Sequence, residues 1–322
     1  MSLVALKVDV DTFRGTREGV PRLVDLFRRH GAGATFLWSL GPDHTGRAIR
    51  RVLRPGFFGK VRRTSVVSHY GVRTLLNGTL LPGPDIGRRG ERIMRGVRDL
   101  GYECGIHCFD HVRWQDGVMR ADARWTLAEM QRAVDRFQRI FGEAPRTHGA
   151  AGWQMNVHAM RLTQQFAFDY CSDGRGTHPH LPVWNAELIR CPQIPTTLPT
   201  LDELIGCDGV TVDNVAANLL ARTQATPAAN HVFTLHAELE GMKLAPVLEQ
   251  LLIGWKAQGH ALVPVRAIYE ALEPMALPRC ATGPGPVAGR SGTLLVQRGE
   301  FLAEFDPAGA PVETERQTVD MT

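Results

Sequence analysis

Short apolar runs alternate with longer amphipathic stretches along most of this chain. The apolar runs are rich in Val, Leu, Ile and Phe, which is typical of buried strands. The expected strands cover residues 3–8, 34–38, 103–106, 168–172, 188–191, 231–236 and 261–265. The stretches between them have apolar side chains at helical spacing, and the expected helices cover residues 19–30, 89–100, 121–141, 157–167, 214–222 and 246–258. This order predicts an α/β fold with a parallel sheet, most simply a (β/α) barrel with its chemistry at the carboxyl ends of the strands.

Two segments interrupt the alternation. Residues 41–88 separate the second expected strand from the next helix, and connections of this length are usually functional or have structure of their own. Beyond Pro274 the chain is rich in Gly, Pro and polar residues, which predicts a weakly ordered tail over residues 276–322. We therefore expect one catalytic domain over residues 1–275, with a long insertion after its second strand.

The composition is that of a globular protein with a large core: 322 residues, 43% hydrophobic and 22% charged, with a formal net charge of +4. No run approaches the ~20 apolar residues that a membrane span requires. The first ten residues have neither the basic region nor the cleavage site of a signal peptide, so a cytoplasmic or peripheral protein is expected. The six cysteines include no CxxC pair and are expected to be reduced.

Two short clusters of acids and imidazoles follow expected strands. Asp9 and Asp11 come after the first strand, and alternation along a strand points both side chains to the same face. His107 and His111 follow the third strand at a spacing of i and i+4, which predicts two imidazoles on one face of a helical turn. Two His and one Asp around an ion leave positions open for water and substrate, as in hydrolytic metal sites. A capping Asp and solvated helix histidines are the alternatives.

A third histidine, His236, ends another expected strand, and Asp173 follows the strand at residues 168–172. A hydrogen bond to Asp173 would orient the His236 imidazole and favour its protonated form, which suits a general acid. The alternative for His236 is a core histidine whose hydrogen bonds are satisfied.

In this order the motifs resemble those of the NodB-like polysaccharide deacetylases (carbohydrate esterase family 4). The resemblance covers roughly residues 3–270 and rests on Asp9-Val10-Asp11, His107-x-x-x-His111, a loop ending in Gly152-Trp153, Asp173 and Leu235-His236. It implies a distorted (β/α) barrel of the NodB type. It also implies that Asp9 is the catalytic base and that His236 is the general acid, oriented by Asp173.

The resemblance further implies one divalent metal ion, held by Asp11, His107 and His111. Two His and one Asp suit Zn, Co, Mn or Ni. Backbone N–H groups in the loop at Ala150 and Ala151 would help to hold the oxyanion. The family often has an Arg in the third motif, whereas this chain has His148 there. Which group adjusts the pKa of Asp9 is therefore an open question.

Longer stretches resemble one branch of this family, whose members remove a formyl group from an amino sugar linked to a lipid phosphate. These stretches are residues 8–12, 14–21, 39–43, 150–154 and 235–241. The branch implies a lipid-linked sugar phosphate as the substrate. The candidate substrate or oxyanion contacts are His148, Ala150, Ala151, Trp153, Glu238 and Glu240.

The insertion has cations interleaved with aliphatic residues and no acid between Arg47 and Arg63, a composition that suits a membrane interface. Each such cation near an anionic leaflet contributes on the order of 1 kcal/mol. The candidate docking residues are Arg50, Arg51, Arg54, Phe57, Phe58, Lys60, Arg62 and Arg63. We expect peripheral binding at the cytoplasmic face of the bacterial inner membrane, with no nucleic acid and no obligate protein partner. A solvated loop and a nucleic-acid patch are the alternatives.

Three functions fit these observations. The first is a deformylase of a lipid-linked sugar, which the family branch connects with lipid A modification and resistance to polymyxin. The second is a metal-dependent deacetylase of another amino sugar, which the basic insertion disfavours. The third is a catalytically silent lipid-sugar-binding module, which has no need of an intact set of catalytic and ligand residues.

Overall fold

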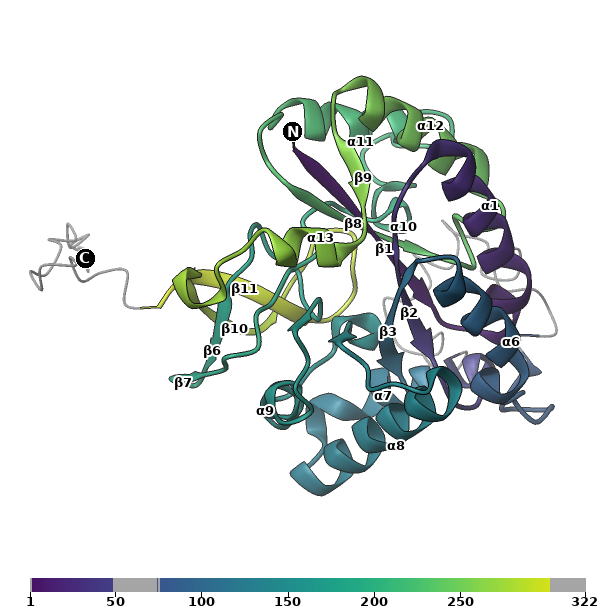
Figure 1. Cartoon of the computed structure of the whole chain (residues 1–322), viewed down its shortest axis with the longest axis vertical. Coiled ribbons are helices and arrows are strands. Elements are labelled where there is room, and N and C mark those ends of the chain that lie inside the picture. Colours follow the sequence, from purple (N-terminus) through teal and green to yellow (C-terminus); the bar gives the residue numbers. More distant parts are fainter. Residues whose placement is uncertain (1, 49–73, 75, 302–322) are drawn as a thin grey trace, which may run out of the picture.

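The computed structural model describes residues 2–48, 74 and 76–301, which form two sheets surrounded by helices (Figure 1). The strands of the larger sheet lie in the order β5-β4-β3-β2-β1-β8, and β9 also pairs with β1. These strands are β1 (Leu3–Val10), β2 (Thr35–Ser39), β3 (Glu103–Cys108), β4 (Thr147–His148), β5 (Tyr170–Cys171), β8 (His231–His236) and β9 (Ala261–Val263). All of their pairings are parallel, so their carboxyl ends share one rim. The predicted α/β fold with a parallel sheet is confirmed.

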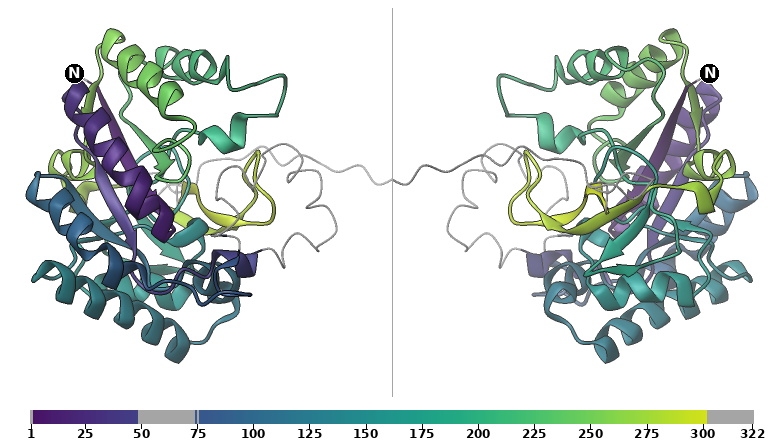
Figure 2. Two further views of the ribbon diagram at one scale, coloured as in Figure 1. Left: turned by 90° about the vertical axis from the view of Figure 1, so that its right-hand side faces the viewer. Right: turned by 90° about the vertical axis from the view of Figure 1, so that its left-hand side faces the viewer.

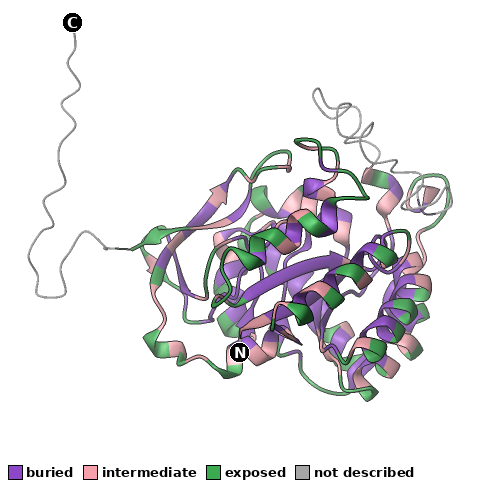
Figure 3. Cartoon of the chain, turned by 90° about the horizontal axis from the view of Figure 1, so that it is seen from above, coloured by how far each residue is buried: buried purple, intermediate pink, exposed green. Residues whose placement is uncertain are grey.

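Helices run around the outside of this curled sheet, and neighbouring helices touch in the order α11-α12-α1-α6-α8-α9 (Figures 1 and 2). Their bounds are α1 (Val20–His30), α6 (Ile86–Asp99), α8 (Ala123–Phe141), α9 (Val157–Gln165), α11 (Val215–Gln224) and α12 (Ala245–Ala257). Three shorter helices lie in the connections: α7 (His111–Gly117), α10 (Leu201–Leu204) and α13 (Val265–Glu270). Figure 3 shows buried strands inside and helices that are exposed on their outer faces.

Side chains at the helix ends explain where these helices begin and end. Asp85, Asp110 and Asp122 cap α6, α7 and α8, because each side chain accepts a backbone N–H three residues further on. Gly31, which ends α1, has a left-handed φ of 59°, a conformation that favours glycine.

The central strand β1 is buried on both faces, but the two faces differ in chemistry. Val4, Leu6 and Val8 belong to the core shared with α1 and α12. The alternate positions Lys7 and Asp9 point to the other side, inside the curl of the sheet, because successive side chains of a strand alternate. The sequence of β1 therefore builds the core with one face and brings charge to the inside with the other.

The second sheet corrects the predicted tail. Its strands lie in the order β11-β10-β6-β7, with β6 (Leu181–Trp184), β7 (Glu187–Leu188), β10 (Arg279–Gly285) and β11 (Leu294–Glu300). The prediction of a weakly ordered segment from residue 276 is wrong as far as residue 301. Its Gly and Pro residues resemble a loop, but β10 pairs with β6, and Cys280, Leu294 and Leu295 are buried. Residues 302–322 lie outside the described residues.

Other predictions have mixed outcomes. The strand predicted at residues 188–191 is limited to β7, and the eight candidate docking residues between Arg50 and Arg63 lie outside the described residues. Across residues 2–48, 74 and 76–301, no helix is both long and apolar enough to span a bilayer.

Candidate active site

The three predicted metal ligands meet at the carboxyl ends of β1 and β3. Oδ1 of Asp11 lies 3.2 Å from Nε2 of His107 and 3.5 Å from Nε2 of His111. One ligand atom from each residue lies within 4.8 Å of the other two. Ligands about 2.0–2.2 Å from one ion in tetrahedral geometry are roughly 3.3–3.6 Å apart, so these separations fit one ion.

The two imidazoles do not share a helical turn as the spacing predicted. His107 is in β3, and His111 is the first residue of α7, so the rings meet across a strand-to-helix junction with centroids 5.3 Å apart. The cap residue Asp110 is still extended, so the helix starts only at His111, which explains the difference.

Hydrogen bonding sets the tautomer of His107. Its Nδ1 lies 2.6 Å from the carbonyl oxygen of Gly149, which only accepts, so Nδ1 carries the proton. Nε2 is then unprotonated, and its lone pair is available to a metal ion on the side of the ring that faces Asp11. An outer hydrogen bond of this kind is the usual support of a metal-binding histidine.

Electrostatics at the site also favour a cation. Oδ1 of Asp9 and Oδ1 of Asp11 are both buried without a hydrogen-bond partner among the described residues. Burial disfavours the Asp11 carboxylate, but His111 and His107 hold the pKa of Asp11 well below its ordinary value. Burial also disfavours a charged His107, but Asp9 and Asp11 raise the pKa of His107. The donor set and its unpartnered oxygens therefore fit a divalent metal ion.

A buried lysine, which the sequence analysis missed, pairs with the predicted catalytic base. Nζ of Lys7 lies 3.3 Å from Oδ2 of Asp9, and both side chains are nearly inaccessible. Gly149 makes room for the lysine, because a Cβ there would lie 2.9 Å from Lys7 Cε and 2.3 Å from Leu37 Cδ1. Lys7 is therefore the cation beside Asp9. Lys7 and Asp9 are two positions apart on one strand and therefore share a face. This spacing was the signal in the sequence that could have identified Lys7.

Glu238 holds the backbone that follows β1, which carries the predicted ligand Asp11. Its Oε1 accepts hydrogen bonds from the backbone N–H groups of Asp11 and Thr12 and from the Thr12 hydroxyl, at 3.2, 2.8 and 2.7 Å. Burial, with the nearby Asp11, raises the pKa of Glu238 well above its ordinary value. Gly15 lies against this side chain, since a Cβ there would overlap Glu238. The structure thus gives Glu238 a positioning role, where a substrate contact was predicted.

His236 is the register partner of Asp9 on the neighbouring strand β8. Parallel partners lie ~4.8 Å apart and project to the same face, so the predicted base and acid are side by side. The backbone N–H of His236 donates to Oε2 of Glu240 at 2.7 Å. Glu240 is fully buried, and this burial raises the pKa of Glu240 to about 7.

Asp173 does not orient His236, and that prediction is wrong. Its Oδ1 lies 2.6 Å from Nδ1 of His148 and accepts the backbone N–H of Ala150 at 2.9 Å, while Oδ2 accepts from Gln193 at 2.9 Å. The strands explain this pairing: β4 and β5 are neighbours at one edge of the sheet, whereas β8 is at the other. Asp173 therefore fixes the loop that follows β4.

That loop contains three of the predicted substrate or oxyanion residues. The N–H of Ala150 is occupied by Asp173, which leaves Ala151 as the candidate oxyanion donor of the pair. Trp153 has a left-handed φ of 52°, which is unusual for a residue other than glycine. Its indole N–H donates to the Thr196 hydroxyl at 3.3 Å. His148 is buried and stacks on Phe168 at 5.9 Å between ring centroids.

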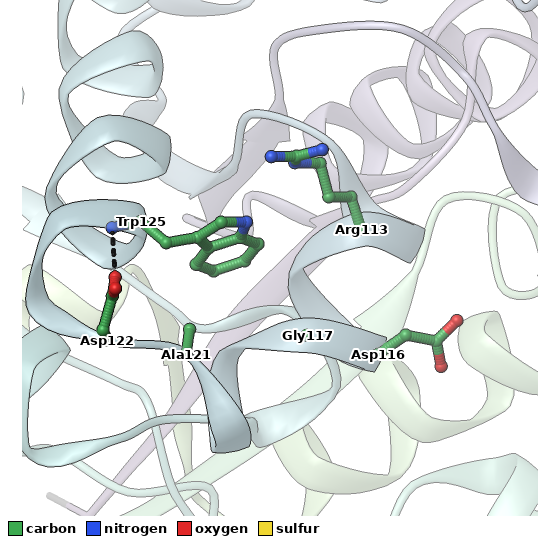
Figure 4. Close-up of a pocket in the computed structure, with 6 residues that line it drawn as sticks. All are labelled: Arg113, Asp116, Gly117, Ala121, Asp122 and Trp125. Carbon is green, nitrogen blue, oxygen red and sulfur yellow. Dashed lines mark hydrogen bonds between the residues drawn. The ribbon is translucent and has the colours of Figure 1, made fainter.

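A separate hollow of about 420 Å³ lies where α7 approaches α8 (Figure 4). It is lined by Arg113, Asp116, Gly117, Ala121, Asp122 and Trp125. The Arg113 guanidinium lies over the Trp125 ring, with its carbon 5.4 Å from the centroid. The residues predicted from the sequence are not among those that line it, so this hollow is distinct from the candidate active site.

Two of the solved structures that share this fold are described as polysaccharide deacetylases. A crystal structure from Mycobacterium smegmatis, assigned to the polysaccharide deacetylases, superposes with a TM-score of 0.57 at 15% identity, covering 86% of this chain and 93% of that chain. A probable polysaccharide deacetylase from Pseudomonas aeruginosa PAO1 gives 0.56 at 16% identity, covering 83% and 90%. The chain therefore has the fold of the NodB-like polysaccharide deacetylases.

Relatives with similar sequences show to which family within this class the chain belongs. A protein of Shewanella sediminis (strain HAW-EB3), named "Probable 4-deoxy-4-formamido-L-arabinose-phosphoundecaprenol deformylase ArnD", is 39% identical over 266 residues, 81% of this chain and 84% of that protein. A protein of the same name from Wigglesworthia glossinidia brevipalpis is 30% identical over 239 residues, covering 74% and 82%. No family model matches the chain. The chain belongs to the family of 4-deoxy-4-formamido-L-arabinose-phosphoundecaprenol deformylases.

Proposed function

We propose that this protein is a metal-dependent amide hydrolase that deformylates 4-deoxy-4-formamido-L-arabinose linked to undecaprenyl phosphate. The names of the two relatives support the sugar and the lipid. The observation that carries the reaction is the position of Asp9. Its Oδ1 accepts no hydrogen bond from the described residues and lies 3.8 Å from Nδ1 of His107, and its strand partner is His236.

The residues divide the hydrolysis between them. Asp11, His107 and His111 would hold a divalent ion, which would act as a Lewis acid on the amide carbonyl and lower the pKa of a water towards ~7. Asp9 accepts a proton as the water oxygen bonds to the formyl carbon. His236 donates a proton to the sugar nitrogen as the C–N bond breaks. One water is consumed, and formate and the free amine are released.

The remaining charged residues keep this arrangement in place. Lys7 balances the charge of Asp9 in a buried environment, where an unpaired carboxylate would be costly. Glu238 holds the backbone that follows β1, and so fixes the direction of Asp11. The N–H of Ala151 is proposed to stabilise the oxyanion.

An anionic membrane surface is the proposed partner, because the proposed substrate is anchored in a bilayer. The described end of the insertion supports this proposal: Leu80 is 81% exposed and Leu81 is 40% exposed. The same turn packs on His44, since a Cβ at Gly78 would lie 2.7 Å from that imidazole. Nδ1 of His44 lies 2.6 Å from Oδ2 of Asp110, the cap of the helix that begins at His111.

This chain of contacts connects the proposed membrane-facing turn to a metal ligand. A sugar held at the lipid surface would therefore be presented close to the site. The product amine is positively charged at neutral pH. Its transfer to lipid A would reduce the negative charge that attracts cationic peptides such as polymyxin.

Formate release from the formamido lipid tests the proposal. We expect release by the metal-loaded protein and its loss with a chelator, and we expect the matched N-acetyl lipid to be a poor substrate. Acetate release in preference to formate would instead indicate a deacetylase of another amino sugar. Binding of the lipid without release of either acid would indicate a catalytically silent module.

A further inference from the structure

Two parts of the insertion pair with each other close to the proposed metal ligands. They form a stem, which comprises residues 41–48 and 77–86. The backbone N–H of Ile86 donates to the carbonyl oxygen of Gly41 at 2.8 Å, and the N–H of Gly46 donates to the carbonyl oxygen of Asn77 at 2.9 Å. These hydrogen bonds hold the two parts of the stem together.

Asp43 ties the stem to the loop that follows β1. Its carboxylate is buried, and Oδ2 accepts the backbone N–H of Phe13 at 3.1 Å. Oδ2 also accepts from the Asn77 amide at 3.3 Å, while Oδ1 accepts the N–H and the hydroxyl of Thr45 at 3.2 and 2.8 Å. Phe13 is two residues after the proposed ligand Asp11. Asp43 therefore fixes the stem against the loop that carries this ligand.

His44, the next residue, reaches the segment that carries the other two ligands. Its Nδ1 lies 2.6 Å from Oδ2 of Asp110, and a carboxylate oxygen accepts, so the imidazole donates this hydrogen bond. Oδ1 of Asp110 caps α7, which begins at the proposed ligand His111. The backbone N–H of Gly41 donates to the carbonyl oxygen of Phe109 at 2.7 Å. The stem thus contacts the two residues that directly precede His111.

The imidazole of His44 is enclosed by the second part of the stem. A Cβ at Gly78 would lie 2.7 Å from its Cδ2, and Gly78 has a φ of 78°, so glycine is needed there for two reasons. A Cβ at Gly83 would overlap the carbonyl oxygen of Asp43. The His44 side chain is 17% exposed as a result. It is therefore held between this part of the stem and Asp110.

We propose that the stem is part of the metal site, and that His44 is a positioning residue for His111. His44 holds the Asp110 carboxylate, and with it the start of α7, where the His111 ring faces Asp11. Because Asp43 and His44 are neighbours, the stem sets the spacing of the two loops that supply these ligands. The proposal deepens the proposed function, since it rests on the ligand assignment made there.

The Zn²⁺ affinity of the full-length protein, measured without lipid, tests this role. We expect His44→Ala to weaken the affinity by about tenfold, because residues that support metal ligands have effects of this size. His44→Asn should lie between His44→Ala and wild type, since its amide N–H can replace the donor at Nδ1. Competition with a chromogenic chelator measures the affinity, and circular dichroism gives the folded fraction to which it is referred.

A double variant tests whether His44 acts through Asp110. Asp110→Ala removes the acceptor and the helix cap together, so it should weaken Zn²⁺ binding at least as much as His44→Ala. The variant with both changes should bind Zn²⁺ no more weakly than Asp110→Ala alone, because both changes break one hydrogen bond. Losses that multiply in the double variant would overturn the proposed route from His44 to the ligand.

His30→Ala is the matched control. Nε2 of His30 lies 2.9 Å from Oε1 of Glu249, and its side chain is 16% exposed, so a similar pair of histidine and carboxylate is lost. His30 ends α1, next to the amino end of β2 and away from the ligands, so this variant should keep the wild-type affinity. A wild-type affinity in His44→Ala would overturn the proposal. An equal loss in His30→Ala, or a loss explained by unfolded protein, would also overturn it.

Formate release, measured separately, distinguishes this proposal from the proposed function. If the wild type binds Zn²⁺ but releases no formate from the formamido lipid, the proposed function fails, and the affinities of the variants still decide the role of His44. If the wild type releases formate and His44→Ala keeps its Zn²⁺ affinity, the positioning role alone fails. A wild type that binds no Zn²⁺ would overturn the ligand assignment and this proposal together.

Discussion

Lys7 and Asp9 form a buried ion pair on one strand, with 3.3 Å between Nζ and Oδ2. The two residues are two positions apart, so they share the inner face of β1. His148, at the position where the family resemblance implies an Arg, contacts Asp173 instead. The positive charge beside Asp9, the proposed base, therefore comes from the same strand, β1.

Replacing Lys7 with Met should destabilise the protein and slow catalysis. The change keeps the volume but leaves the Asp9 carboxylate buried without its counter-charge, which costs about 3–5 kcal/mol. Urea unfolding of Lys7→Met measures this loss. The control is the double variant Lys7→Met/Asp9→Asn, which should recover most of the stability because it removes both charges. An unchanged unfolding midpoint in the single variant would contradict the importance of the pair.

Changes at Asp9 and Asp11 should separate catalysis from metal binding. Asp9→Ala should keep the bound metal and lower kcat by about 10²- to 10⁴-fold, the usual contribution of a general base. Asp11→Ala should lose the metal, because it removes one of three ligands. Metal analysis of both proteins, purified side by side, checks the assignment. Full metal retention in Asp11→Ala would overturn the role of Asp11 as a ligand.

Glu240 should make the stability of the fold depend on pH. Burial raises the pKa of Glu240 to about 7, so the folded protein holds this proton more tightly than the unfolded chain does. The contribution is fully present below the ordinary pKa of 4.5 and is lost as the pH rises through about 7. A difference of this size corresponds to roughly 3 kcal/mol.

Urea unfolding at about pH 5 and pH 8 measures this loss in the wild type. Glu240→Gln is the control, because it cannot titrate and its amide oxygen can still accept the backbone N–H of His236. The difference between the two pH values should shrink by a few kcal/mol in this variant. An identical pH dependence in the two proteins would show that Glu240 does not titrate as expected.

The exposed pair Leu80 and Leu81 should contribute to membrane binding. Replacing both with Gln should weaken the affinity for anionic vesicles, measured by sedimentation, by about tenfold. Partial burial of two leucines in an interface contributes about 1–3 kcal/mol. The fold should tolerate the change, since both side chains are solvent-accessible. Met275→Gln is the control, because Met275 is also exposed, at 72%, but lies outside the insertion. Equal binding of the Leu variant and the wild type would exclude this turn from the interface.

The structure brings the three predicted ligands together, because their positions depend on local rules. Asp11 and His107 follow or end apolar strands, and parallel strands bring their carboxyl ends to one rim. The helical spacing of His107 and His111 was misleading, because Asp110 starts a helix only after the first imidazole. The local sequence pattern identified these residues, but it did not predict the conformation of the backbone between them.

Long-range pairings were less accessible to sequence reasoning. Asp173 contacts His148 rather than His236 because of the strand order, which the sequence does not state. The β10–β11 hairpin resembled a loop because its Gly and Pro residues are poor strand formers. Its burial depends on pairing with β6, which lies about a hundred residues earlier in the chain.

The pairing of β1 also has a consequence for how the protein is made. β1 is the first strand, and β2 on one side of it follows early in the chain, but its partners on the other side, β8 and β9, begin only at residues 231 and 261. During synthesis, the strand that carries the proposed base must wait for most of the chain before β8 and β9 can pair with it. The proposed ligands at residues 11, 107 and 111 emerge well before that point, so the nascent chain would meet cellular metal ions before the proposed acid at residue 236 has been added.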